Sequence, residues 1–280
     1  MNLITLAPDI PTRALKELAT LADASGIQAV AGGAFCLADA NPGARAPVAA
    51  YCAANRIDFG WVPARRRLDD FGLVVMDMDS TLITIECIDE IADMQGLKPE
   101  VSAITEAAMR GELDFSASLL RRVALLKGLP EAALRRAYDE RLQLSPGAEE
   151  LIASLKAAGI RTLLVSGGFT FFTERLRERL GLDYTAANTL EVIDGRLTGK
   201  LVGAIVDAQA KAEHLLRVRD QLGLRPGQTL AMGDGANDLG MMAASGVSVA
   251  YRAKPLVREQ ADYALNFSGL AGILALMGGK

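Results

Sequence analysis

Two short acidic motifs each follow an apolar run in this sequence of 280 residues. Asp77 and Asp79 end the first run, in VVMDMDSTL, and Asp234 and Asp238 end the second, in LAMGDGANDLG. Residues two apart on a strand face the same way, so both carboxylates of the first motif should reach one crevice. Neighbouring carboxylates repel, which raises the pKa of one of them or calls for a cation between them. Helix N-capping is the alternative explanation for each motif.

Hard oxygen ligands at the ends of two strands suit Mg²⁺, which typically uses one or two carboxylates together with substrate phosphate. Asn237 lies within the second motif and adds another oxygen. A dinucleotide-binding loop is excluded, because Asp238 stands where the third glycine after Gly233 and Gly235 would be.

A third motif, LLVSGGF, ends an apolar run at Ser166, Gly167 and Gly168 before a helical stretch begins. A hydroxyl and free backbone N–H groups at a helix start can bind an anion, although a plain turn has the same sequence. Lys211, on an amphipathic stretch, is by itself an ordinary solvated lysine. Because His214 is the single histidine, a His-rich metal site is excluded, and we expect catalysis to depend on carboxylates.

Five apolar runs must position these motifs: residues 72–76, 161–165, 228–232, 247–251 and 263–267. Runs that are apolar throughout predict a parallel sheet covered on both faces, as in a doubly wound α/β fold. Four helix-like stretches between residues 84 and 145 make that connection too long for a crossover, so we expect a helical cap. Asp194-Gly195 predicts a two-residue hairpin.

The first 68 residues have a different pattern. A strand at 2–7, a helix at 11–26 and a strand at 27–38 predict a βαβ unit, followed by a helical stretch at 47–56. The basic run of Arg65, Arg66 and Arg67 is expected to be a solvated linker. We therefore place a domain boundary near residue 68.

Composition excludes several classes of protein. A charged fraction of 23% and a net charge of -4 give no general nucleic-acid-binding surface. The start of the chain does not have the pattern of a signal peptide, and no apolar run reaches the roughly 18 residues of a membrane span. We expect a cytoplasmic protein without a membrane partner, which excludes an ion pump. Cys36, Cys52 and Cys87 are expected to be reduced.

The order DxDST, SGG, Lys and GDGAND resembles the haloacid dehalogenase-like hydrolases, and DMDSTLITIECIDEIA and AKAEHL are similar to the phosphoserine phosphatases among them. The resemblance covers residues 72 to about 270. It implies a Rossmannoid core over 69–280 with a helical cap inserted at about 84–145. It also implies a small α+β domain of the ACT-like type over 1–68.

The resemblance further implies the activity, which is the Mg²⁺-dependent hydrolysis of O-phospho-L-serine to L-serine and phosphate, the last step of serine biosynthesis. Asp77 would be the nucleophile that forms an aspartyl-phosphate, and Asp79 the general acid and base. Mg²⁺ would be held by Asp77, by the backbone carbonyl of Asp79 and by Asp234, with Asp238 supporting them.

Substrate-binding residues follow from the same resemblance. Ser166, Gly167 and Lys211 would bind the phosphate, with Asn237 beside the metal and the substrate. Glu86 would bind the ammonium group, and Arg122 would grip the carboxylate through two parallel hydrogen bonds. Met109 and Phe115 would line the same pocket with apolar surface.

Two alternatives stay open at the level of the sequence. One is a capped phosphatase for phosphothreonine, phosphohomoserine or a sugar phosphate. The other is a non-catalytic amino-acid sensor, although a scaffold has no need of all four of Asp77, Asp79, Lys211 and Asp234. The sequence decides neither whether the first domain binds serine nor whether the chain forms a homodimer.

Overall fold

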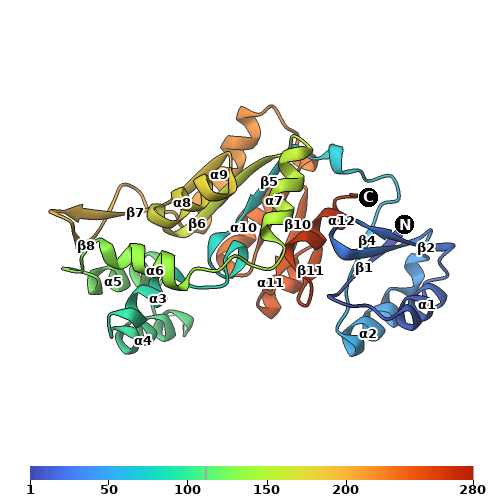
Figure 1. Cartoon of the computed structure of the whole chain (residues 1–280), viewed down its shortest axis with the longest axis horizontal. Helices are drawn as coiled ribbons and strands as arrows, with labels where there is room; N and C mark the ends of the chain where they lie inside the picture. The colour runs from blue at the N-terminus through green and yellow to red at the C-terminus, as the bar shows by residue number, and fades with distance from the viewer. Residues whose placement is uncertain (111, 280) are drawn as a thin grey trace.

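One mixed sheet of eleven strands runs through the whole molecule. The computed structural model describes residues 1–110 and 112–279, except for the side chain of Met109. The strand order is β2-β3-β1-β4-β11-β10-β9-β5-β6-β7-β8, so the two ends of the chain share one sheet (Figure 1). Among the helices of the described residues, none combines the length and the apolar character needed to cross a membrane.

Six neighbouring strands form the parallel part of the sheet; five contain the apolar runs, and the sixth, β7, was expected only as one arm of the hairpin. Every residue of the central β5 is buried, because helices cover both of its faces. The strands are β5 (Leu73–Met76), β6 (Arg161–Phe169), β7 (Tyr184–Ile193), β9 (Thr229–Gly233), β10 (Val247–Tyr251) and β11 (Tyr263–Leu265).

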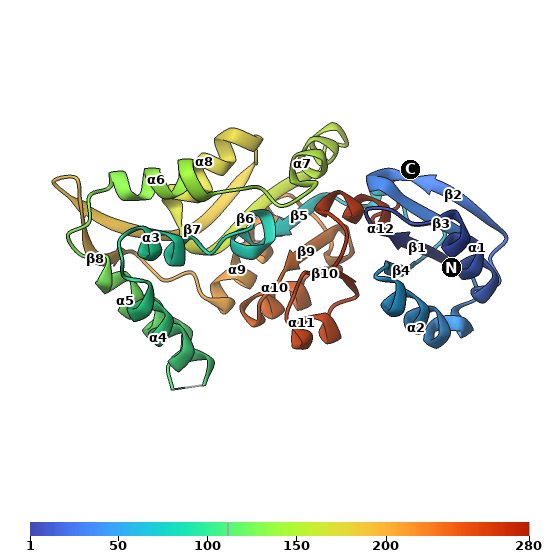
Figure 2. The ribbon, with the colours of Figure 1, turned by 60° about the horizontal axis from the view of Figure 1, so that its bottom comes forward.

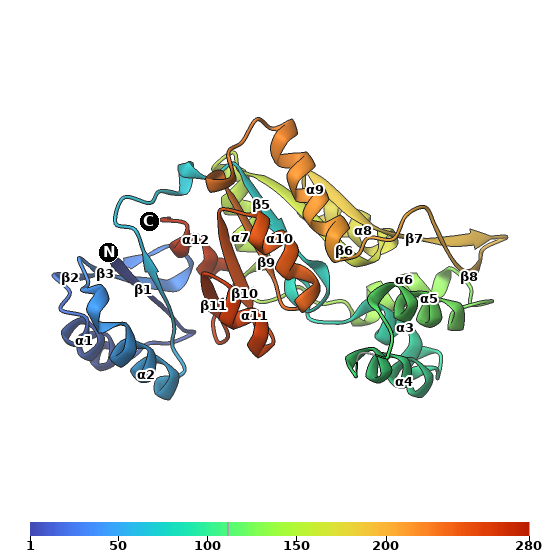
Figure 3. The same cartoon turned by 180° about the vertical axis from the view of Figure 1, so that it is seen from behind.

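Helices pack on both faces of these strands, which confirms the doubly wound fold. One apolar core joins the sheet to α7 (Ala148–Ala157), α8 (Thr170–Leu180) and α12 (Ile273–Leu276). A second core joins the opposite face to α9 (Ala208–Gln221), α10 (Leu239–Ala244) and α11 (Pro255–Gln260). Figure 3 shows α9 and α10 in front of the sheet.

The four helix-like stretches after β5 form helices and gather beside one end of the sheet, seen at the left of Figure 2. We call residues 87–141 the four-helix segment. The two stretches of backbone that connect it to the core are joined by a hydrogen bond of 2.9 Å from Thr84 N–H to the Gln143 carbonyl. Its helices are α3 (Cys87–Met94), α4 (Lys98–Met109), α5 (Phe115–Leu125) and α6 (Ala132–Arg141).

The predicted hairpin is present, formed by the end of β7 and by β8 (Arg196–Val202). Asp194 and Gly195 both have positive φ, 50° and 70°, as the tight turn requires. The hairpin extends beyond the core and contacts the four-helix segment, where the Leu197 carbonyl accepts a hydrogen bond of 2.8 Å from Gly128 N–H.

The first 62 residues, which we call the N-terminal module, contain the expected strand-helix-strand unit but have more strands than expected. Residues 27–38 form an antiparallel hairpin instead of one strand, because Gly32 and Gly33 both adopt a φ of 69° and turn the chain. The strand β1 pairs antiparallel with β3, and β3 pairs antiparallel with β2, so β1 and β2 run parallel to each other with β3 between them. Helix α1 connects β1 to β2, and β4 pairs antiparallel with β1 on its other side. Its elements are β1 (Asn2–Leu6), α1 (Thr12–Leu21), β2 (Gly26–Val30), β3 (Ala34–Ala38), α2 (Arg45–Asn55) and β4 (Asp58–Val62).

The module joins the core through β4, which pairs with the edge strand β11 at Phe59 and Ala264. Beside this pairing, the buried carboxylate of Asp58 accepts hydrogen bonds of 2.7–2.9 Å from the backbone N–H groups of residues 266, 267 and 268. The edge of the parallel sheet is thereby covered by strand pairing, which also holds the module in place.

Candidate active site

A cavity of about 560 Å³ lies at the carboxyl ends of β5, β6 and β9, where an open α/β sheet is expected to bind its ligand. It brings together most of the residues that the sequence singled out. Those that line it are Asp77, Asp79, Glu86, Phe115, Arg122, Ser166, Gly167, Asp234 and Asn237.

Asp77 is held where β5 leaves the sheet, because its backbone N–H donates to the Met232 carbonyl of β9 at 3.1 Å. Its side chain is almost wholly buried. The next residues, Met78–Leu82, form a tight turn in which Asp79 is extended and Ser80 has a φ of 56°. This turn separates the directions of the two carboxylates.

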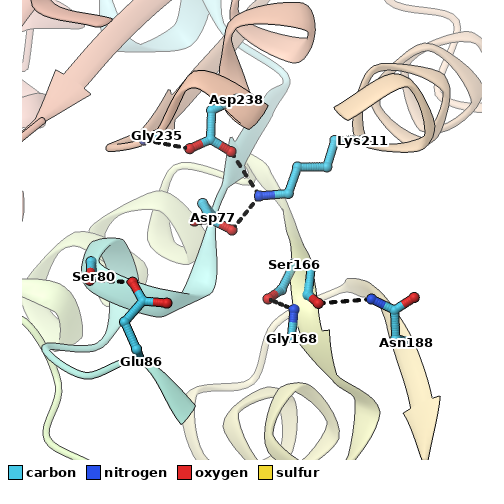
Figure 4. Close-up of polar contacts among 10 residues, drawn as sticks. Asp77, Ser80, Glu86, Ser166, Gly168, Asn188, Lys211, Gly235 and Asp238 are labelled. Carbon is cyan, nitrogen blue, oxygen red and sulfur yellow. Dashed lines mark hydrogen bonds and ion pairs between the residues drawn. The ribbon is translucent and has the colours of Figure 1, made fainter. Parts of the chain in front are cut away.

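Lys211 lies behind Asp77. Its ammonium group donates to Asp77 Oδ1 at 2.5 Å and to Asp238 Oδ1 at 2.7 Å, and the side chain is 1% exposed (Figure 4). Burial alone would lower the pKa of Lys211, but the charges of the two aspartates outweigh it and raise that pKa. Lys211 was expected both to bind the phosphate and to lower the pKa of Asp77; in the structure its ammonium group contacts Asp77 and Asp238.

Carboxylate oxygens of Asp77, Asp234 and Asp238 all lie within 4.8 Å of one another. Burial, followed by the charge of Asp238, raises the pKa of Asp234 to about 6. Burial and Asp238 likewise raise the pKa of Asp77, which the single charge of Lys211 opposes. Three carboxylates therefore face one ammonium group, and a divalent cation would balance them. This all-oxygen donor set fits a hard cation such as Mg²⁺.

The Asp79 side chain turns elsewhere, and its Oδ1 accepts a hydrogen bond of 3.1 Å from Cys87 N–H. Burial, followed by the charge of Glu86, raises the pKa of Asp79 to about 7. The two aspartates of the first motif thus have different surroundings: Asp77 contacts a cation, whereas Asp79 can hold a proton near neutral pH.

The SGG turn, formed by Ser166, Gly167 and Gly168, faces the same cavity. It lies within the end of β6 and not after the strand as expected, at the point where the pairing with β7 shifts register. Ser166 Oγ accepts a hydrogen bond of 2.8 Å from Gly168 N–H, which leaves its own proton free for an anion. Asn188 of β7 holds the turn by donating to the Gly167 carbonyl at 2.8 Å (Figure 4). Its side-chain oxygen also accepts from Val206 N–H at 2.8 Å. Asn188 was not expected at this site, and its one signal in the sequence is a polar residue within a β-type run.

Glu86 and Arg122 reach the cavity from the four-helix segment. Glu86 accepts a hydrogen bond of 2.7 Å from Ser80 Oγ, and burial raises its pKa. Arg122 Nε is buried without a hydrogen-bond partner among the described residues. Phe115 lies so close to the SGG turn that a Cβ on Gly167 would be 2.7 Å from its ring. The Met109 side chain, expected here, lies outside the described part of the chain.

Similarity to known proteins extends over most of the chain. Residues 74–243 match the family model of the haloacid dehalogenase-like hydrolases, and residues 3–48 match the model of a domain of unknown function. A phosphoserine phosphatase of a Polaromonas species is 57% identical over 216 residues, which cover 75% of this chain and 92% of that protein.

Two solved structures extend the similarity to three dimensions. The unliganded structure of a probable phosphoserine phosphatase from Vibrio cholerae covers 99% of this chain and 86% of its own, with 40% identity and a TM-score of 0.87. A substrate-bound phosphoserine phosphatase complex covers 73% of this chain and 97% of its own, with 42% identity and a TM-score of 0.69. The chain therefore belongs to the haloacid dehalogenase-like hydrolase family, in which these relatives are phosphoserine phosphatases.

Proposed function

We propose that this protein hydrolyses O-phospho-L-serine to L-serine and inorganic phosphate with Mg²⁺ as its cofactor. The observation that carries the proposal is the contrast between two aspartates in one cavity. Asp77 lies 2.5 Å from the Lys211 ammonium group, whereas Asp79 has a pKa of about 7. Hydrolysis of a phosphate ester through a covalent intermediate requires two such groups, a nucleophile and a proton carrier.

In the first step, Asp77 attacks phosphorus in line with the departing oxygen. A bond forms between the Asp77 carboxylate and phosphorus, and the bond from phosphorus to the serine oxygen breaks. Asp79 gives its proton to that oxygen, so serine leaves as the neutral alcohol. The carboxylate of Asp77 becomes an aspartyl-phosphate.

In the second step, Asp79 is ionised and removes a proton from water. The water oxygen attacks phosphorus, phosphate leaves, and the Asp77 carboxylate is restored. Asp79 ends protonated, as it began. Its hydrogen bond from Cys87 N–H holds the side chain in place while it alternates between these two states.

Asp77, the backbone carbonyl of Asp79 and Asp234 would hold Mg²⁺, which when bound neutralises phosphate charge. Asp238 and Asn237 would support this set, and Lys211 would keep Asp77 ionised and fixed. The Ser166 hydroxyl and the Gly167 N–H would bind the phosphate oxygens on which charge is spread in the transition state.

Substrate choice would rest on Glu86 and Arg122. The Glu86 carboxylate suits an ammonium group, and the Arg122 guanidinium suits a carboxylate. Arg122 Nε, buried and unpartnered among the described residues, is a donor that a substrate carboxylate could satisfy. This pair of side chains favours the phosphate ester of an amino acid over a sugar phosphate.

The test is Mg²⁺-dependent phosphate release from O-phospho-L-serine, measured beside phosphothreonine and a sugar phosphate. We expect the highest kcat/KM for phosphoserine and a loss of at least about a hundredfold in Asp77→Asn. Asp139→Asn, which changes an exposed aspartate of α6, is the matched control and should keep full activity. Full activity in Asp77→Asn, or equal rates on the three esters, would contradict the proposal.

A further inference from the structure

A second cavity lies between the N-terminal module and the core, away from the catalytic cavity. It has a volume of about 720 Å³, large enough for a small metabolite. Both halves of the chain form its walls: the end of α2 on one side, and the turn after β10 together with α11 on the other. Figure 3 shows α2 of the module and α11 of the core on the two sides of the boundary between them.

Three arginines line this interface cavity: Arg56 from the module, and Arg252 and Arg258 from the core. Asp9 is the one acidic residue among its lining residues. Within the described residues, none of the three guanidinium groups has a carboxylate within 4.0 Å. The lining therefore carries three positive charges against one negative charge, on arginines that are solvent-exposed and have no direct ion pair among the described residues.

The contacts of these arginines leave most of their donors available. Arg56 stacks over the Phe267 ring, with 4.9 Å from its guanidinium carbon to the ring centroid, and Arg252 lies 5.4 Å from the Tyr251 centroid. Arg258 donates a long bond of 3.4 Å to Asn266 Oδ1. Stacking on an aromatic face orients a guanidinium group, while its N–H groups, which lie in the guanidinium plane, stay free to donate hydrogen bonds.

We propose that this interface cavity binds a small dianion, either a tetrahedral oxyanion or a dicarboxylate, through Arg56, Arg252 and Arg258. Planar guanidinium groups bind carboxylate and phosphate oxygens through paired hydrogen bonds. The three positive charges exceed the single charge of a monoanion, so a dianion fits the site better. Because the arginines come from both halves, a bound anion would also join the module to the core.

The interface cavity and the catalytic cavity are neighbours. Arg252 and Ala253 line the former, and Lys254 lines the latter. The Lys254 N–H also donates to the Asp234 carbonyl at 3.2 Å. Since an oxyanion could enter the catalytic cavity too, the test must compare variants of the interface arginines in otherwise unchanged protein.

The test titrates the full chain with sodium sulfate and, separately, with sodium succinate, by calorimetry and by the thermal unfolding midpoint, with chloride at equal ionic strength as reference. We expect one of the two anions to bind and to raise the midpoint. In Arg252→Gln combined with Arg258→Gln, its dissociation constant should rise at least about tenfold, because two of the three guanidinium groups are lost. Arg121→Gln combined with Arg136→Gln, on exposed arginines of the four-helix segment, should bind as the unmodified protein does.

Arg56→Gln provides an independent variant on the module side, and its midpoint in chloride shows whether it is folded. This variant should also weaken binding of the anion that the unmodified protein binds. Binding of sulfate alone would assign the site to tetrahedral oxyanions, and binding of succinate alone to dicarboxylates. The proposal is overturned if neither anion binds, or if both bind the arginine variants as tightly as the unmodified protein.

Discussion

Lys211 and Asp77 are 134 positions apart in the chain, yet their ammonium nitrogen and carboxylate oxygen lie 2.5 Å apart in the interior. The same ammonium group contacts Asp238, so one positive charge serves two buried carboxylates. Removing one member of such a group leaves an uncompensated charge, which costs more than the pair itself contributes. The pair therefore links the stability of the site to its chemistry.

Lys211→Met should lower kcat by about a hundredfold or more, because Asp77 would take up a proton and lose its nucleophilic form. The measurement is the initial rate of phosphate release from phosphoserine with saturating Mg²⁺. Lys200→Met, at an exposed position of β8, is the matched control and should leave the rate unchanged. An active Lys211→Met variant would show that Asp77 needs no ammonium group beside it.

The residue types and order of the motifs were enough to predict the central part of this site. Asp77 and Asp234 each follow an apolar strand and Ser166 lies near the end of another, and parallel strands bring such ends to one edge of a sheet. The helices after β5 and the hairpin at 194–195 could be predicted because the local sequence pattern alone indicates them.

What the sequence did not predict depends on contacts between distant residues. Asp58 and Ser268 are separated by 210 positions, and nothing near either of them indicates the other. Asn188 supports the SGG turn only because β7 lies beside β6. In the module, the Gly32-Gly33 pair was a local turn signal, but the apolar residues around it were interpreted as one strand.

Arg122→Ala should reduce kcat/KM for phosphoserine by roughly 10- to 100-fold, the loss expected for hydrogen bonds of about 1.5–3 kcal/mol to a charged group. Hydrolysis of a small aryl phosphate, which lacks the amino-acid carboxylate, should change by less than about threefold. Arg121→Ala is the matched control, since Arg121 is the exposed neighbour on the same helix. Equal losses on both substrates would remove Arg122 from substrate choice.

Gly168→Ala tests the close approach of the SGG turn to Asp79. A Cβ at this position would lie 2.8 Å from Asp79 Oδ2, 2.9 Å from Met78 Cε and 3.0 Å from Ser166 Oγ, so the side chains of Asp79 and Met78 must shift. Displacing a proton carrier by a fraction of an ångström should lower kcat by about tenfold or more. Gly227→Ala, where a Cβ meets nothing within 4 Å, should have no effect on the rate. An unchanged rate in both variants would show that the position of Asp79 is not critical.

The metal-free protein should lose stability as the pH rises from about 4 to about 7. Asp79, with a pKa of about 7, and Asp234, with a pKa of about 6, bind protons more tightly when folded than when unfolded. Their contribution is fully present below about pH 4 and is lost as the pH passes these raised values. Thermal midpoints in chelator across this range would measure it, and the increase in midpoint on adding Mg²⁺ should be larger at pH 7 than at pH 5. A midpoint that rises over the same range would contradict the raised pKa values.

Asp58→Asn should loosen the junction between the N-terminal module and the core. The Asp58 carboxylate accepts from three backbone N–H groups and from Ser268 Oγ, and Asn offers one carbonyl oxygen in place of two carboxylate oxygens. The weakened and lost bonds should destabilise the fold by about 1.5–3 kcal/mol, which for a chain of this size lowers the thermal midpoint by several degrees. Asp139→Asn, on an exposed aspartate, should leave the midpoint within about one degree of the unmodified protein. Since Asp58 lies outside the catalytic cavity, phosphate release well below the midpoint should be unaffected, and a loss of activity with an unchanged midpoint would instead mean that this junction acts on the active site.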